Sequence, residues 1–145
     1  MKSSNDENQL LFNITRVDQI GIVVNDVDKT MKKYETFFGI EPFMTLESAV
    51  NSAKLKIGLL YMDNTQIELI QVTEGETIHS KFLKEKGEGL HHLGFFVDDI
   101  EKELSRMEEG GIQVLEKGLV LDLVKYVYLD TQQTLGTIYE LIQFD

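Results

Sequence analysis

The chain contains an internal repeat, and this repeat limits the possible folds more than any other feature of the sequence. The segment VDQIGIVVNDVD, residues 17–28, matches LHHLGFFVDDIE, residues 90–101, at a constant offset of 73. Later in each copy, TQIELIQV from Thr65 and GTIYELIQF from Gly136 share the letters ELIQ at an offset of 72. Because the offset changes by one residue over about 50 positions, we interpret the repeat as a duplicated structural module.

Each copy has the hydrophobic pattern of a strand, a helix and three further strands. The first helix begins at Asn25 or Asp26 and ends at Gly39, and the second ends at Gly110 and Gly111. A short linking helix is expected at residues 77–85. Strands are predicted at residues 16–24, 41–46, 55–62 and 65–72 in the first copy, and at 90–97, 113–115, 120–129 and 137–144 in the second.

These patterns predict an α+β fold in which two tandem βαβββ modules form a curved mixed sheet around a metal pocket. We expect an N-terminal tail (1–13), a first module (14–74), a linking helix (75–89) and a second module (90–145).

Composition excludes several classes of function. The net charge of −11 argues against nucleic acid or an anionic membrane as a partner, since the protein's own field would repel either one. The chain has no cysteine, which excludes disulfides and cysteine zinc sites and is typical of a reducing compartment. No apolar run reaches membrane length, and the polar start MKSSNDENQ has no signal-peptide core. We therefore expect a cytoplasmic protein with a small-molecule substrate.

Four polar residues recur at matched positions of the duplicated strands. Gln19 matches His92, and Glu68 matches Glu140. Each alternates with apolar neighbours, so all four are expected on the sheet face that the helices do not cover. Two curved four-stranded sheets closing around that face would bring the four side chains into one pocket. One imidazole, two carboxylates and one amide oxygen suit a divalent ion with open coordination positions, such as Co, Mn, Ni, Zn or Fe.

Two other histidines are interpreted differently. His91 has the opposite strand parity and is expected to support a ligand from behind or to lie at the surface, and His79 is expected to be solvated. On the linking helix, Lys81, Lys84 and Lys86 form either a solvated face or a contact to the phosphates of a CoA ester.

At these residues the chain resembles the vicinal oxygen chelate superfamily of glyoxalases, bleomycin-resistance proteins and extradiol dioxygenases. Within it the chain is most similar to the methylmalonyl-CoA epimerase family, and KFLKEKGEGLHH is the most specific matching segment. The resemblance implies metal ligands Gln19, Glu68, His92 and Glu140, catalytic roles for Glu140 and Glu68, and a homodimer. It also implies an acyl-CoA or glutathione-adduct substrate.

The resemblance leaves three functions open. The first is a metal-dependent epimerase or isomerase that moves a proton alpha to a thioester carbonyl through a metal-stabilised enolate. The second is a glyoxalase I-like lactoylglutathione lyase, because epimerases usually have histidine in place of Gln19. Ile57 also stands about where many bacterial epimerases have a second catalytic glutamate. The third is a non-catalytic small-molecule binding protein of the same fold.

Overall fold

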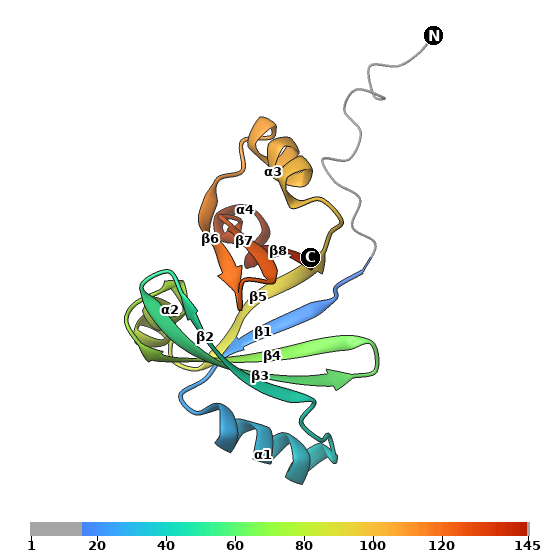
Figure 1. Cartoon of the computed structure of the whole chain (residues 1–145), viewed down its shortest axis with the longest axis vertical. Coiled ribbons are helices and arrows are strands. Elements are labelled where there is room, and N and C mark those ends of the chain that lie inside the picture. Colours follow the sequence, from blue (N-terminus) through green and yellow to red (C-terminus); the bar gives the residue numbers. More distant parts are fainter. Residues whose placement is uncertain (1–15, 145) are drawn as a thin grey trace.

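The computed structural model describes residues 16–144 of the chain (Figure 1). The tail expected at residues 1–13 lies outside the described residues. The described first half contains β1 (Gln19–Val23), α1 (Val27–Phe38), β2 (Met44–Val50), β3 (Ala53–Met62) and β4 (Thr65–Glu74). After α2 (Ile78–Lys86), the second half contains β5 (Gly89–Phe96), α3 (Ile100–Glu109), β6 (Val114–Val120), β7 (Val124–Leu129), α4 (Gln132–Leu135) and β8 (Ile138–Phe144).

The strands form a single eight-stranded sheet in the order β2-β3-β4-β1-β5-β8-β7-β6. At its centre β1 pairs antiparallel with β5, and each of these strands has a parallel partner from its own half, β4 or β8. The sheet order is therefore the same when read outward from the centre in either direction. This confirms the mixed sheet of two tandem modules, and it shows that the modules pair within one chain.

The curvature of the sheet brings its two edge strands toward each other. The backbone N–H of Leu121 donates to Ser48 Oγ at 3.3 Å, and Asn51 Nδ2 donates to the Lys117 carbonyl at 3.4 Å. These two side-chain contacts join the β2 and β6 edges. The sheet is therefore nearly closed around its concave face.

The two long helices cover the outer face of the sheet, one for each half. Val27 and Met31 of α1 pack on the first half, and Ile100, Leu104 and Met107 of α3 pack on the second. Figure 1 shows α1 and α3 at opposite ends of the molecule. Each of these helices thus turns an apolar face to the sheet, and the concave face is left for other contacts.

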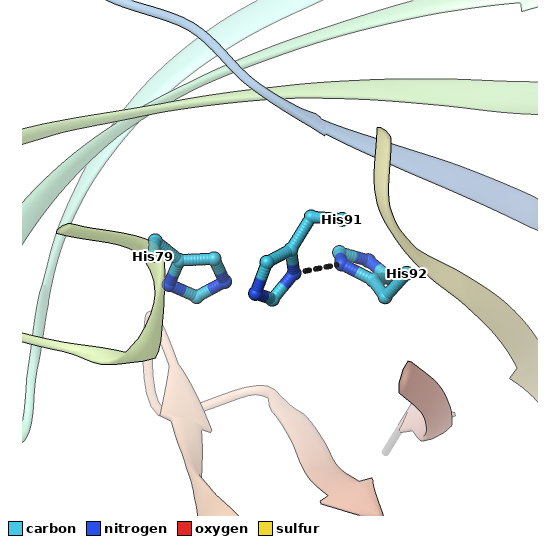
Figure 2. A group of neighbouring side chains, drawn as sticks. All are labelled: His79, His91 and His92. Atoms are coloured by element: carbon cyan, nitrogen blue, oxygen red, sulfur yellow. Dashed lines mark hydrogen bonds between the residues drawn. The ribbon is translucent and has the colours of Figure 1, made fainter. Parts of the chain in front are cut away.

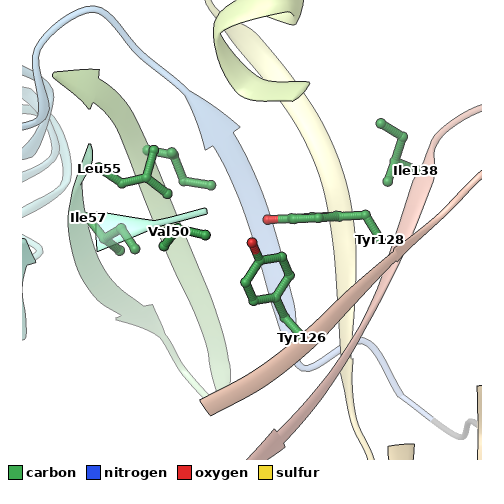
Figure 3. Close-up of a cluster of buried hydrophobic side chains, with 7 residues drawn as sticks. Val50, Leu55, Ile57, Tyr126, Tyr128 and Ile138 are labelled. Atoms are coloured by element: carbon green, nitrogen blue, oxygen red, sulfur yellow. The ribbon is translucent and has the colours of Figure 1, made fainter. Parts of the chain in front are cut away.

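A third apolar cluster lies inside the curve and is made by both halves (Figure 3). The first half supplies Val50, Leu55, Ile57 and Ile70, and the second supplies Tyr126, Tyr128 and Ile138. In Figure 3 the two tyrosine hydroxyls point toward the side of Leu55 and Ile57. The concave face thus combines apolar packing with a small number of polar groups.

The predicted helix ends agree with the structure, but one predicted strand was wrong. The Asp26 side chain accepts a hydrogen bond from the Lys29 N–H at the start of α1, and Gly39 ends this helix with a φ of 68°. Residues 120–129 were expected to form one strand. Instead the chain turns after β6, where Leu121 and Asp122 have φ values of 52° and 56°. This left-handed backbone is rare for residues other than glycine. The apolar sequence around Leu121 therefore gave no sign of a turn.

Helix α2 connects the halves at the inner side of the sheet. Thr77 accepts a hydrogen bond from the His79 N–H, and the Thr77 N–H donates to Ser80 Oγ, so both groups cap the helix start. The helix contacts β4, β5 and β1. Among the helices in residues 16–144, none is long and apolar enough to cross a membrane.

Candidate metal centre

The four polar residues of the repeat lie on four neighbouring central strands. Gln19 is on β1, Glu68 on β4, His92 on β5 and Glu140 on β8. These strands are adjacent in the order β4-β1-β5-β8, and all four side chains point into the concave face. The structure therefore brings together the complete set that the sequence predicted as one cluster.

Three oxygen atoms surround one nitrogen of the buried His92 ring. The Nε2 atom lies 2.8 Å from Glu140 Oε2, 3.1 Å from Gln19 Oε1 and 3.4 Å from Glu68 Oε1. The His92 side chain is 0% exposed, whereas those of Glu140 and Glu68 are 6% and 15% exposed. One imidazole nitrogen carries a single proton or a single lone pair, so it cannot satisfy three oxygens at once.

The amide of Gln19 is oriented by a second glutamine that the sequence reasoning missed. Gln19 Nε2 donates to Gln66 Oε1 at 2.7 Å, and Gln66 Nε2 donates to Tyr61 Oη at 2.9 Å. This chain of hydrogen bonds turns the Gln19 oxygen, not its nitrogen, toward His92. Gln66 is two residues before Glu68 and therefore lies on the same face of the strand. This spacing could have identified Gln66 from the sequence.

Two glycines of the repeat leave room for these side chains. A Cβ atom on Gly21 would overlap the His92 ring, and one on Gly94 would lie 2.9 Å from Gln19 Oε1. Gly21 and Gly94 are matched positions of the duplication. Each half therefore provides the space into which the other half's ligand candidate fits.

The electrostatics of the cluster are governed by burial and by opposite charge. Burial, the largest influence, lowers the pKa of His92, but the charges of Glu140 and Glu68 outweigh burial and raise this pKa to about 9. Burial raises the pKa of Glu140 to about 7, with His92 acting against this shift and Glu68 adding to it. Both effects arise because two carboxylates share one partner away from water.

The residues fit a divalent cation. A single His92 Nε2 proton can serve only one of Glu68 Oε1 and Glu140 Oε2, and among the described residues neither of these buried oxygens has another donor. Such oxygens are costly to bury unless a positive charge or a donor compensates them. Glu68, His92 and Glu140 each offer a ligand atom, and these atoms lie within 4.8 Å of one another. A mixed oxygen and nitrogen donor set suits the ions expected from the sequence.

A small pocket of about 90 Å³ opens onto the cluster. Gln19, Glu68 and Glu140 line it together with Gln66 and Tyr126. The rest of the lining is apolar and includes Ile57, Leu59 and Ile142. Ile57 is 4% exposed, so an aliphatic side chain occupies the position considered for a second catalytic glutamate.

His91 lies inside the protein, so the surface alternative for this residue was wrong. Its residue exposure is 2%, and its Nδ1 lies 2.9 Å from His92 Nδ1. The β1–β5 register moves from the Gly21–His92 pair to the Ile22–Leu90 pair, which leaves His91 unpaired in a β-bulge. Strict alternation of side chains does not hold at a bulge, which accounts for the failure of the surface alternative, whereas support of a ligand from behind stays a prediction.

His79 is also buried, and the expectation that it is solvated was wrong. It is 2% exposed, and its Nε2 forms a 3.0 Å hydrogen bond with the hydroxyl of Tyr128. Figure 2 shows His79, His91 and His92 side by side on the concave side of the sheet. Burial, followed by the rings of His91 and His92, holds the pKa of His79 well below its usual value. Burial likewise lowers the pKa of His91 to about 3, with His92 and Lys86 adding to the shift.

The lysines of α2 do not line the pocket of the four-residue cluster. Lys81 and Lys84 line a different pocket of about 520 Å³, together with Glu76 and Glu116. The Lys86 ammonium lies 5.7 Å from the centre of the Phe82 ring.

Comparison with known proteins agrees with this architecture. The family model of the glyoxalase/bleomycin resistance protein/dioxygenase superfamily matches residues 18–122. The uncharacterized protein YqjC of Bacillus subtilis is 24% identical over 90% of this chain and 93% of its own length. The ethylmalonyl-CoA/methylmalonyl-CoA epimerase of Cereibacter sphaeroides is 27% identical over 72% of this chain and 78% of its own.

Solved structures share the fold. The hypothetical protein BH1468 from Bacillus halodurans has a TM-score of 0.77 at 24% identity and covers 90% of this chain and 94% of its own. A variant of Streptomyces coelicolor methylmalonyl-CoA epimerase in complex with 2-nitronate-propionyl-CoA has a TM-score of 0.71 at 25% identity, over 91% of this chain and 96% of its own. Together with the family match over residues 18–122, these likenesses place the chain in the glyoxalase/bleomycin resistance protein/dioxygenase superfamily.

Proposed function

We propose that this protein is a divalent-metal-dependent epimerase or isomerase that moves a proton alpha to the thioester carbonyl of a small acyl-CoA. The observation that carries the proposal is the convergence of Gln19, Glu68 and Glu140 oxygens on His92 Nε2 at the end of a pocket. Relatives named as methylmalonyl-CoA epimerases support the same reaction class.

The size of the pocket supports a short acyl group as the reacting part. A volume of about 90 Å³ is far below that of a site enclosing a whole cofactor-sized ligand. In this proposal the acyl end enters between the apolar walls that include Ile57 and Leu59. The nucleotide end of the CoA ester stays outside the concave face.

The cluster has the groups that such a reaction needs. Gln19, Glu68, His92 and Glu140 would hold the ion. When bound, a divalent ion supplies Lewis acidity toward two substrate oxygens and so stabilises the negative charge that develops when the alpha proton leaves.

Glu140 is the proposed base. Its carboxylate lines the pocket and takes the alpha proton, the proton-transfer role that a positioned glutamate can fill. In this proposal Glu68, which lines the same pocket and is more exposed, returns a proton to the other face of the carbon. One proton leaves and one arrives, and the configuration inverts.

A glyoxalase I-like lyase is the second candidate, and the amide donor favours it. Gln19 presents an oxygen fixed by Gln66, and Ile57 provides no second carboxylate from β3. The same proton transfer on a glutathione hemithioacetal would need only one carboxylate. The two functions therefore share the cluster and differ in the substrate that enters the pocket.

The test is solvent exchange of the alpha proton. Cobalt-loaded protein in catalytic amount is mixed with methylmalonyl-CoA in deuterated water, and the alpha-proton signal is followed by NMR. We expect the signal to disappear, and to persist after chelation of the metal and in Glu140→Gln. If it persists with metal bound while methylglyoxal plus glutathione is turned over, the lyase is correct. If neither substrate reacts while metal is bound, both proposed reactions fail, and a binding protein of the same fold is the candidate that is left.

A further inference from the structure

The bulge in β5 creates an unusual contact between consecutive residues. In a regular strand neighbouring side chains point to opposite faces. Here His91 has no partner on β1, and its Nδ1 reaches to 2.9 Å from Nδ1 of His92. Two histidine rings therefore meet behind the cluster of oxygens, on the side of His92 away from Glu140.

The two nitrogens of His92 face different surroundings. Nε2 faces the oxygens of Gln19, Glu68 and Glu140, and Nδ1 faces His91. A ring that binds a cation through Nε2 must have no proton there, so its remaining proton is on Nδ1. At 2.9 Å that proton is donated to the lone pair of His91 Nδ1. Ligating histidines usually make such a bond to a carboxylate, a carbonyl or water, and here the acceptor is an imidazole.

The acceptor is itself held in place by the linking helix. The His91 ring centre lies 4.7 Å from that of His79 and 5.1 Å from that of Phe82, and both of these residues are on α2. The hydrogen bond between His79 Nε2 and the Tyr128 hydroxyl and the contact with Thr77 fix His79 in turn. A ring that is 2% exposed and packed on two sides has little freedom to rotate away from His92.

We infer that His91 is a positioning residue that fixes the tautomer and the ring orientation of His92, so that Nε2 is the nitrogen offered to a divalent cation. The inference rests on the proposed metal centre. It assigns a role to the linking helix as well, because His79 and Phe82 of α2 pack against His91, which in turn contacts His92. Loss of such a supporting contact typically lowers metal affinity by about 10- to 100-fold.

The first test measures affinity for Zn²⁺ by chelator competition at neutral pH in the full chain. We expect His91→Leu to lose about 10- to 100-fold in affinity, and His91→Asn to recover part of this loss because its side-chain oxygen can accept the proton of Nδ1. The control is Met107→Leu, a volume-conserving change in the core cluster under α3, which is expected to leave the zinc affinity at the wild-type value. Circular dichroism checks that each variant is folded.

A second measurement needs no substitution. In zinc-loaded, ¹⁵N-labelled protein, a hydrogen bond between two ring nitrogens gives a nitrogen–nitrogen coupling across the bond, and we expect this coupling between Nδ1 of His92 and Nδ1 of His91. Its absence, or wild-type affinity in folded His91→Leu, would overturn the inference while the metal centre stands. If wild type binds no zinc and no other divalent ion, the metal centre and the inference both fall.

Discussion

The two halves of the sheet have the same frame but carry different chemistry on their inner faces. The strand register pairs Glu68 with Leu59 in the first half and Glu140 with Tyr128 in the second. In the same way Ile57 of β3 corresponds to Tyr126 of β7, since they pair with Ile70 and Ile142. The first half thus presents aliphatic walls where the second presents phenols.

The two carboxylates differ in how deeply they are buried, although Gln19 of the first half is only 4% exposed. The side chains of His92 and Glu140 are 0% and 6% exposed, and Glu68 in the first half is 15% exposed. Helix α2 accounts for part of this difference, because His79 and Phe82 pack behind the histidines of the second half. Duplication therefore accounts for the matched positions of the four groups, and the packing around them accounts for the greater exposure of Glu68.

The largest expected effect compares the two carboxylates. Glu140→Gln should reduce alpha-proton exchange by about 10²–10⁴-fold, because it removes the proposed base. Glu68→Gln should reduce the exchange rate less, since Glu140 is still present to remove the alpha proton. Both variants are measured with saturating metal, by NMR in deuterated water. A larger loss in Glu68→Gln would exchange the two assignments.

The paired glycines provide the next comparison. Gly21→Ala places a methyl group in the space of the buried His92 ring, and overpacking of this kind costs about 1–3 kcal/mol in the free energy of unfolding. Gly94→Ala meets Gln19 Oε1 at 2.9 Å and Gln19 Cβ at 3.0 Å, and should cost less because its overlap is much smaller than the overlap at Gly21. Urea unfolding of both variants measures the difference. Equal costs would mean that the depth of the steric overlap does not decide the loss of stability at these two positions.

Tyr128→Phe probes the polar wall that the first half lacks. The change leaves His79 Nε2 without its 3.0 Å partner, and a buried unsatisfied group costs about 1–3 kcal/mol. The double variant Tyr128→Phe, His79→Leu should recover part of this loss, since neither partner then needs a hydrogen bond. Additive losses in the double-mutant cycle would show that the two side chains are not coupled.

The smallest expected effect is a pH dependence that comes from His79. Its folded-state pKa is lowered, so the unfolded chain binds the proton more readily. The stabilisation is present above the unfolded value of about 6.5 and is lost as the pH falls below it, by at most about 1.4 kcal/mol per pH unit. Unfolding free energies between pH 7 and pH 5 should fall more steeply in wild type than in His79→Leu. Parallel curves would contradict this.

Much of the frame and the site could be predicted because both depend on repetition. Side chains alternate between the two faces of a regular strand. The duplicated sequences therefore predicted the faces on which Gln19, His92, Glu68 and Glu140 lie. The predictions that failed concern two residues whose surroundings the local sequence pattern does not determine. At His91 a bulge breaks the alternation of side chains. His79 is buried by contacts of α2 with β5 and β7 of the second half, which lie far from it in the sequence.

The most direct test of the account is a crystal structure of cobalt-loaded protein with anomalous scattering measured at the cobalt edge. One anomalous peak is expected per chain, about 2.0–2.2 Å from His92 Nε2 and from oxygens of Gln19, Glu68 and Glu140. Such a peak would show both halves sharing one ion. The imidazoles of His79, His91 and His92 also lie close enough to hold a metal. A peak among those rings, or no peak within reach of the two glutamates, would contradict the account.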